Sequence, residues 1–153
     1  MNSVVDIRRD RSAVDFALLV VRIFVGIVFV AHGSQKMFGA FGGHGLAGTV
    51  QFMGPIGYLV AVGEFFGGLG VLLGFLSRFS AAAQTVIMLG AIFTVHLRNG
   101  FIGTVGKPGF EFPFALIGLL ACILIAGPGR YTIGRMLPLP KDSSGERPIA
   151  YLE

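Results

Sequence analysis

The sequence predicts an all-α integral membrane protein, an antiparallel four-helix transmembrane bundle with glycine-rich outer loops. Of its 153 residues, 54% are hydrophobic and only 13% are charged, whereas soluble domains have about 45–50% apolar and about 25% charged residues. The mean hydropathy is +0.78, and a chain this short cannot build a core large enough to hide that much apolar surface from water. The apolar residues also gather in four long segments.

Each of these segments is long enough, or nearly so, to cross the hydrocarbon core, which takes about 20 predominantly apolar residues. They comprise residues 16–36, 55–76, 79–97 and 112–127. Backbone groups in lipid must be hydrogen-bonded within the protein, so we expect helices rather than open strands. Only two residues separate the second segment from the third, which predicts a tight helical hairpin and an antiparallel bundle.

The segments divide the chain into a membrane domain and two tails. We expect a cytoplasmic N-terminal tail at residues 1–15, the membrane domain at 16–131 and a cytoplasmic C-terminal tail at 132–153. The connections on the opposite side of the membrane, residues 37–54 and 99–111, are both rich in glycine. Such stretches can dip toward the headgroups only where protein or water satisfies their backbone.

The distribution of lysine and arginine predicts the orientation in the membrane, because cytoplasmic loops carry an excess of both residues. Eight of them fall on the side of the two termini and three on the other side. We therefore expect a multi-pass protein of the bacterial inner membrane with both termini in the cytoplasm. The two sets are Arg8, Arg9, Arg11, Arg78, Arg130, Arg135, Lys141 and Arg147 against Lys36, Arg98 and Lys107.

Ionisable residues inside a bilayer cost about 2.5–3.5 kcal/mol each at a helix centre, so each of them needs an explanation. Glu64 falls near the middle of the second segment, and Arg22 interrupts the first. A buried Arg22–Glu64 ion pair and a proton relay through Glu64 explain these positions equally well. Gln84, in the third segment, is expected to make interhelical hydrogen bonds.

A second group of polar residues lies in the outer half of the predicted bundle. His32 and His96 fall inside it, and Lys36, Arg98 and Glu111 fall at its outer boundary. Because histidine titrates near neutral pH, these side chains could form one pocket that binds a ligand or handles protons. The alternative is structural, with each histidine bridging neighbouring helices and Lys36 extending to the headgroups.

Glycine spacing indicates where helices could pack closely against one another. Gly63 and Gly67, and Gly70 and Gly74, form patterns that let helices pack closely, either within the bundle or between copies in a homo-oligomer.

The single cysteine, Cys122, excludes a disulfide framework or a thiolate metal site within one chain, and we expect no metal. The net charge of +4 comes from scattered basic residues, so no nucleic acid is expected either.

Five motifs in order resemble the DoxX family of small bacterial membrane proteins. They are residues 32–39 (HGSQKMFG), Glu64 with the following Gly67-Gly68, and residues 96–100 (HLRNG), 110–113 (FEFP) and 127–131 (GPGRY). The resemblance implies a four-helix inner-membrane protein. Some relatives are membrane subunits of thiosulfate:quinone oxidoreductase, and others associate with redox-defence enzymes. The polar positions that match the family are His32, Lys36, Glu64, His96, Arg98 and Glu111.

The function expected from this resemblance is that of an accessory subunit in a membrane oxidoreductase system linked to quinone. His32 or His96 would hydrogen-bond a quinone oxygen, and Glu64 or Glu111 would pass protons. Two alternatives remain. One is a non-catalytic scaffold or assembly partner for other membrane or redox subunits. The other, which we rank lower, is a protein that holds b-type haem between His32 and His96.

Overall fold

The computed structural model describes residues 2–136, with side chains from residue 11 to residue 135. The part of the expected C-terminal tail at residues 137–153 lies outside the described residues. All the regular structure described is helical, apart from an isolated β-bridge between Thr104 and Lys107. The α-helices are α1 (Asn2–Phe38), α2 (Gly45–Met53), α3 (Ile56–Leu73), α4 (Ser77–Ala91), α5 (Glu111–Ala126) and α6 (Ile133–Met136). A π-helical segment, Ile92–His96, and a 3-10 turn, Leu97–Asn99, continue α4 to residue 99, and a second 3-10 turn, Ala40–Gly42, follows α1.

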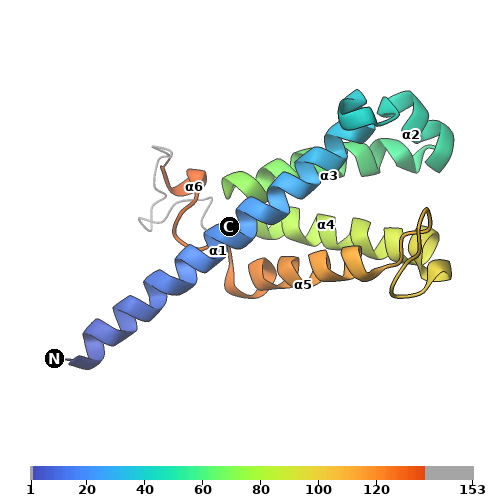
Figure 1. Ribbon diagram of the computed structural model, residues 1–153. Coiled ribbons are helices and arrows are strands. Elements are labelled where there is room, and N and C mark those ends of the chain that lie inside the picture. The colour runs from blue at the N-terminus through green and yellow to red at the C-terminus, as the bar shows by residue number, and fades with distance from the viewer. Residues whose placement is uncertain (1, 137–153) are drawn as a thin grey trace.

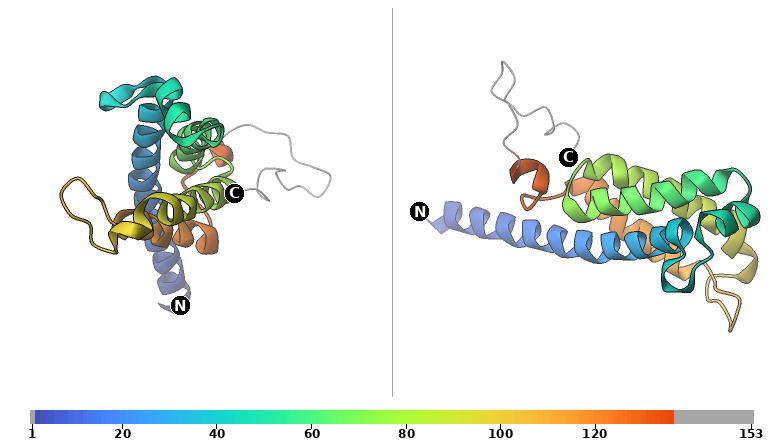
Figure 2. Two further views of the ribbon diagram at one scale, coloured as in Figure 1. Left: turned by 90° about the vertical axis from the view of Figure 1, so that its right-hand side faces the viewer. Right: turned by 90° about the horizontal axis from the view of Figure 1, so that it is seen from above.

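Four of these helices, α1, α3, α4 and α5, run alongside one another (Figure 1). Helix α1 packs mainly on α3 and also touches α5, while α4 packs between α3 and α5. We call the end that holds α6 and the short α3–α4 connection the turn end. The opposite end, which holds α2 and the connection between α4 and α5, is the loop end (Figure 2).

The structure confirms the prediction of a helical membrane protein. Three helices are long and apolar enough to cross a membrane: Arg11–Phe38, Ile56–Leu73 and Ser77–Asn99. Helix α5 is also apolar but has 16 residues, about 24 Å at 1.5 Å per residue, which is shorter than the hydrocarbon core of about 30 Å. Large apolar side chains such as Phe24 and Ile125 are exposed on the outside of the helices, as lipid contact requires.

Glycines allow α1 and α3 to pack with their backbones close together. A Cβ atom added to Gly26 would lie 2.6 Å from Leu72 Cβ, and one added to Gly68 would lie 2.8 Å from Phe29 Cβ. At Gly33 the added atom would collide with the backbone of Phe65. These three glycines let the helices approach in the manner of close transmembrane helix pairs. They lie outside the predicted patterns at Gly63–Gly67 and Gly70–Gly74, and contact between copies of the chain through those patterns stays a prediction.

The predicted boundaries differ from the structure at both ends of the first helix. From residue 2 onward, the expected N-terminal tail is part of α1, whose 37 residues give it a length of about 55 Å. Much of the expected loop 37–54 is helical as well, because it contains α2. Left-handed glycines at Gly39 (φ 74°) and Gly54 (φ 70°) bracket this segment, and their conformation is one that other residues adopt at a cost.

The second predicted loop does lack a helix between residues 100 and 110, but it is folded. Thr104 and Lys107 exchange two backbone hydrogen bonds, of 3.0 and 2.9 Å, around a turn with Gly106 at φ 78°. Two further backbone bonds run from Phe110 N to Gly100 O (3.2 Å) and from Glu111 N to Phe101 O (3.1 Å). This hairpin ends directly at α5 and so fixes the position of the first turn of that helix.

Candidate functional site

An ion pair between α1 and α3 forms the centre of the candidate site. Lys36 Nζ lies 2.6 Å from Glu64 Oε2, and the side chains are 26% and 4% exposed respectively. The antiparallel packing of α1 and α3 produces this pair, because the end of α1 reaches the middle of α3. Lys36 is also held through its backbone, where its carbonyl accepts a 3.2 Å hydrogen bond from Thr49 Oγ1 on α2.

Gln84 joins α4 to the same level of α3. Its Nε2 donates to the backbone carbonyls of Gly63, at 3.2 Å, and Glu64, at 3.0 Å. The expected interhelical hydrogen bonds of Gln84 are therefore present. Its side chain is fully buried, and Oε1 has no hydrogen-bond partner among the described atoms. A buried amide oxygen can accept one more hydrogen bond, so this position beside Glu64 has unused acceptor capacity.

His32 lies one helical turn before Lys36 on α1 and within electrostatic range of both Lys36 and Glu64. Its ring packs against Phe112 at the start of α5, with 5.9 Å between ring centroids. The side chain is exposed at the surface of the protein, which in a membrane-spanning helix means that lipid-dissolved molecules can reach the imidazole. His32 thus combines access from the bilayer with proximity to a buried ion pair.

His96 takes part in a different arrangement at the loop end. Its Nδ1 lies 3.0 Å from the carbonyl oxygen of Pro108, which also accepts a 2.9 Å bond from Asn99 Nδ2. Because a carbonyl oxygen only accepts, Nδ1 must carry the proton, and in the neutral ring Nε2 is then left as an acceptor. His96 and Asn99 together hold the 100–110 hairpin against the end of α4.

The other two predicted site residues lie near this hairpin. Glu111 is in the first turn of α5, where the helix dipole favours a negative charge. Its Oε2 is buried and has no hydrogen-bond partner in the part of the chain described. Arg98 is exposed. No described contact links Arg98 or Glu111 to the Lys36–Glu64 pair, so the predicted residues form two groups at the loop end.

The expected ion pair between Arg22 and Glu64 does not form in the described structure. Arg22 is 1% exposed and lies 14 residues before Lys36, about 21 Å away along α1. At that level α1 faces the last turn of α3 rather than its middle. The Arg22 guanidinium donates to backbone carbonyls of Val71 (2.9 Å), Leu72 (3.1 Å), Pro128 (2.9 Å) and Tyr131 (2.7 Å).

These bonds give Arg22 a structural role. Val71 and Leu72 belong to the last turn of α3, whose carbonyls have no intrahelical partner and whose dipole favours a cation. Pro128 and Tyr131 belong to the 127–131 motif, which folds back onto α1. A further contact of that motif, from Arg130 N to Asp15 Oδ1 at 3.1 Å, strengthens the link between the two ends of the sequence.

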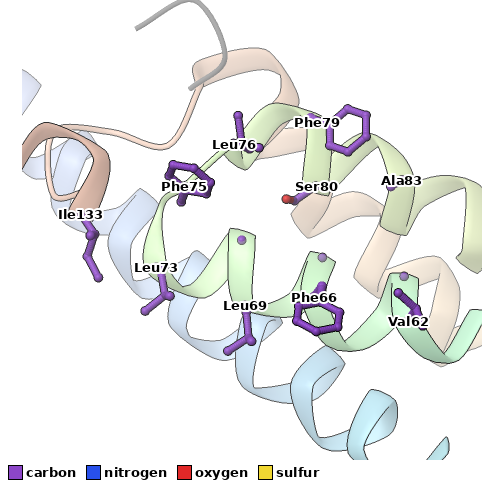
Figure 3. A pocket seen from close by; sticks show the side chains of 13 residues that line it. Val62, Phe66, Leu69, Leu73, Phe75, Leu76, Phe79, Ser80, Ala83 and Ile133 are labelled. Carbon is purple, nitrogen blue, oxygen red and sulfur yellow. The ribbon is translucent and has the colours of Figure 1, made fainter. Parts of the chain in front are cut away.

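A large cavity lies away from the predicted polar residues. It has a volume of about 590 Å³ and opens between α3 and α4 toward the turn end (Figure 3). Apolar side chains such as Phe66 and Phe79 line it, and among the described lining residues only Ser80 supplies a side-chain oxygen. The sequence analysis missed this cavity, because serine within an apolar helix has no distinctive spacing. The small residues Gly63, Gly67 and Gly70 that line α3 were the available signal.

Comparison with known proteins gives the family. The DoxX family model matches residues 17–97. "Putative oxidoreductase CatD" of Bacillus subtilis (strain 168) is 32% identical over 67% of this chain and 73% of its own length. "Inner membrane protein YqjF" of Escherichia coli (strain K12) is 34% identical over 80% and 93%. "Uncharacterized membrane protein Rv3486" of Mycobacterium tuberculosis (strain ATCC 25618 / H37Rv) is 31% identical over 86% and 87%.

No solved structure matches the chain. The family match covers α1 from residue 17 onward and the whole of α3 and α4, which belong to the three helices that are long enough to span a membrane. The relatives cover most of the chain, and two of them are named as membrane proteins. This chain is therefore a membrane protein that belongs to the DoxX family.

Proposed function

We propose that this protein is an accessory subunit of a membrane oxidoreductase system linked to quinone, located in the bacterial inner membrane with both termini in the cytoplasm. The relative named "Putative oxidoreductase CatD" supports the redox link. The arrangement that carries the proposal is His32, open to the bilayer, beside the buried Lys36–Glu64 pair. A lipid-soluble electron acceptor would reach the imidazole from the hydrocarbon side.

The chemistry assigned to this group is proton transfer. Reduction of a quinone to a quinol consumes two electrons and two protons, so the protein must supply protons where the quinone oxygen lies. His32 hydrogen-bonds that oxygen and Glu64 replaces its proton, with Lys36 stabilising the carboxylate after the proton has left. In the same scheme, His96 and Glu111 are the candidate hydrogen-bonding and proton-passing groups beside the 100–110 hairpin. The electrons come from the partner subunits.

The test uses the complex purified from its own membrane in mild detergent. A positioned acid–base group contributes about a hundredfold or more to a rate. We therefore expect His32→Ala to lower the rate of quinone reduction by at least about tenfold. His44→Ala is the matched control, because His44 is exposed and lies before α2, outside both polar groups. A wild-type rate in His32→Ala would reject the proposal.

The scaffold alternative also has an observation in its favour. Helix α1 continues past the other helices at the turn end (Figure 1), and this extension offers a surface for a partner subunit. The scaffold alternative would be favoured by a variant in which His32, Glu64 and His96 are all replaced. The same partners should co-purify with that variant, and the complex should keep its full rate of quinone reduction. The same preparation tests the haem alternative, since a Soret absorption band would require haem in the purified chain.

A further inference from the structure

The cavity between α3 and α4 has the composition of a binding site for a largely apolar molecule. Its volume, about 590 Å³, falls within the range of about 300–1,000 Å³ usual for small-molecule sites, which are mostly apolar with a few placed polar groups. Phe66 and Phe79 flank it, Phe75 closes it toward the turn, and Ser80 lies between them (Figure 3). None of the described residues that line it is charged.

Ser80 is the feature that points to a ligand. The residue is only 6% exposed, and its hydroxyl points into the cavity (Figure 3). The described structure gives this hydroxyl no hydrogen-bond partner. By contrast, Thr85 and Thr94 in the same helix region each donate to the carbonyl four residues earlier, both at 2.8 Å. The hydroxyl is therefore available to a molecule in the cavity, and a bound hydrogen-bond acceptor would give it a partner.

The position of Ser80 along the membrane normal indicates which chemical group would accept a hydrogen bond from its hydroxyl. Ser80 is the fourth residue of α4, so it lies about 5 Å from the start of that helix. The hydrocarbon core gives way to the polar interfacial region near helix ends, and the ester carbonyls of phospholipids lie at that boundary. Below this level the cavity is apolar.

We propose that this cavity binds one glycerophospholipid, with an acyl chain between α3 and α4 and its ester carbonyl accepting a hydrogen bond from Ser80. The headgroup stays outside, because the cavity itself offers no charge partner. An acyl chain alone would leave the hydroxyl unsatisfied. The site is distinct from the His32–Lys36–Glu64 group and does not depend on the proposed redox function.

The experiment compares an ester-linked phosphatidylglycerol with its ether-linked analogue, which has the same headgroup and chains but no ester carbonyl. Binding to the purified full-length protein is measured by native mass spectrometry across a lipid titration. We expect the wild type to bind the ester lipid about fivefold more tightly, the value of one net hydrogen bond of about 1 kcal/mol. In Ser80→Ala the two lipids should bind equally.

A second variant tests the cavity apart from the hydroxyl. Ala83 lines the cavity, so Ala83→Phe should fill it and weaken both lipids at least about fivefold. Its matched control is Ala82→Phe, because Ala82 is the neighbouring residue and is exposed outside the cavity. Ser34→Ala controls for loss of a serine, since Ser34 donates to Val30 O at 2.6 Å in α1. Both controls should retain the ester preference.

Three results would overturn the proposal. The first is equal binding of the two lipids by the wild type, and the second is an ester preference that survives in Ser80→Ala. The third is displacement of the phospholipid by a substoichiometric isoprenoid quinone or by a second copy of the chain, which would make that molecule the occupant instead.

Discussion

Lys36 of α1 and Glu64 of α3 form a 2.6 Å ion pair in which the carboxylate side chain is 4% exposed. The pair defines the register of the two helices, since a shift of α1 by one turn would move the ammonium group about 5.4 Å away from the carboxylate. Removing one partner from a buried pair leaves an uncompensated charge, which is far more costly than replacing the whole pair.

We therefore expect Lys36→Met and Glu64→Gln each to lower the free energy of unfolding, Lys36→Met by about 3 kcal/mol. The charge-swapped double variant, Lys36→Glu with Glu64→Lys, should recover at least half of that loss. Unfolding by SDS titration in mixed micelles measures each value. Lys107→Met is the control, because Lys107 is exposed on the hairpin. A double variant no more stable than either single variant would show that the charges do not interact.

Replacing Arg22 should release the 127–131 motif from α1. Arg22→Met removes the four described hydrogen bonds to carbonyls, and a hydrogen bond with a charged partner makes a net contribution of about 1.5–3 kcal/mol. We expect a loss of at least about 3 kcal/mol and faster hydrogen–deuterium exchange at residues 129–135. Arg78→Met is the control, since Arg78 is exposed and makes one long contact of 3.5 Å. Unchanged exchange would contradict the assignment.

The glycines of α1 and α5 should respond oppositely to alanine. Gly33→Ala places a methyl group against the backbone of Phe65, and overpacking of this kind costs about 1–3 kcal/mol. Gly118→Ala places it in open space, where alanine is the better helix former by about 1 kcal/mol. Thermal unfolding in detergent should show a lower midpoint for the first variant only. Equal midpoints would mean that α1 and α3 do not pack this closely.

The expected orientation can be tested by cysteine labelling. With Cys122 replaced by alanine, a cysteine at Val105, on the exposed hairpin at the loop end, should react with a membrane-impermeant maleimide in spheroplasts. A cysteine at Arg78, at the turn end, should react only after the membrane is disrupted. The reverse pattern would place the termini outside the cytoplasm.

Composition and segment length were sufficient to predict a helical membrane protein, because lipid permits few other folds. They could not predict α2, since nine residues that begin with Gly45 and contain Gly48 have no strong helix preference and depend on contacts such as Thr49 with Lys36. The identity of the site residues was partly predictable from charge in apolar segments. Their pairing was not predictable, because the register of α1 against α3 determines that Lys36, and not Arg22, reaches Glu64.

The carbonyls around Arg22 have a consequence for biogenesis. Pro128 and Tyr131 are translated more than a hundred residues after Arg22, at about 5–20 residues per second, so the arginine enters the bilayer several seconds before these two acceptors exist. Until then its guanidinium must draw on water, lipid phosphates or the insertion machinery. The nascent first helix consequently reaches its final environment only after residue 131 has been translated.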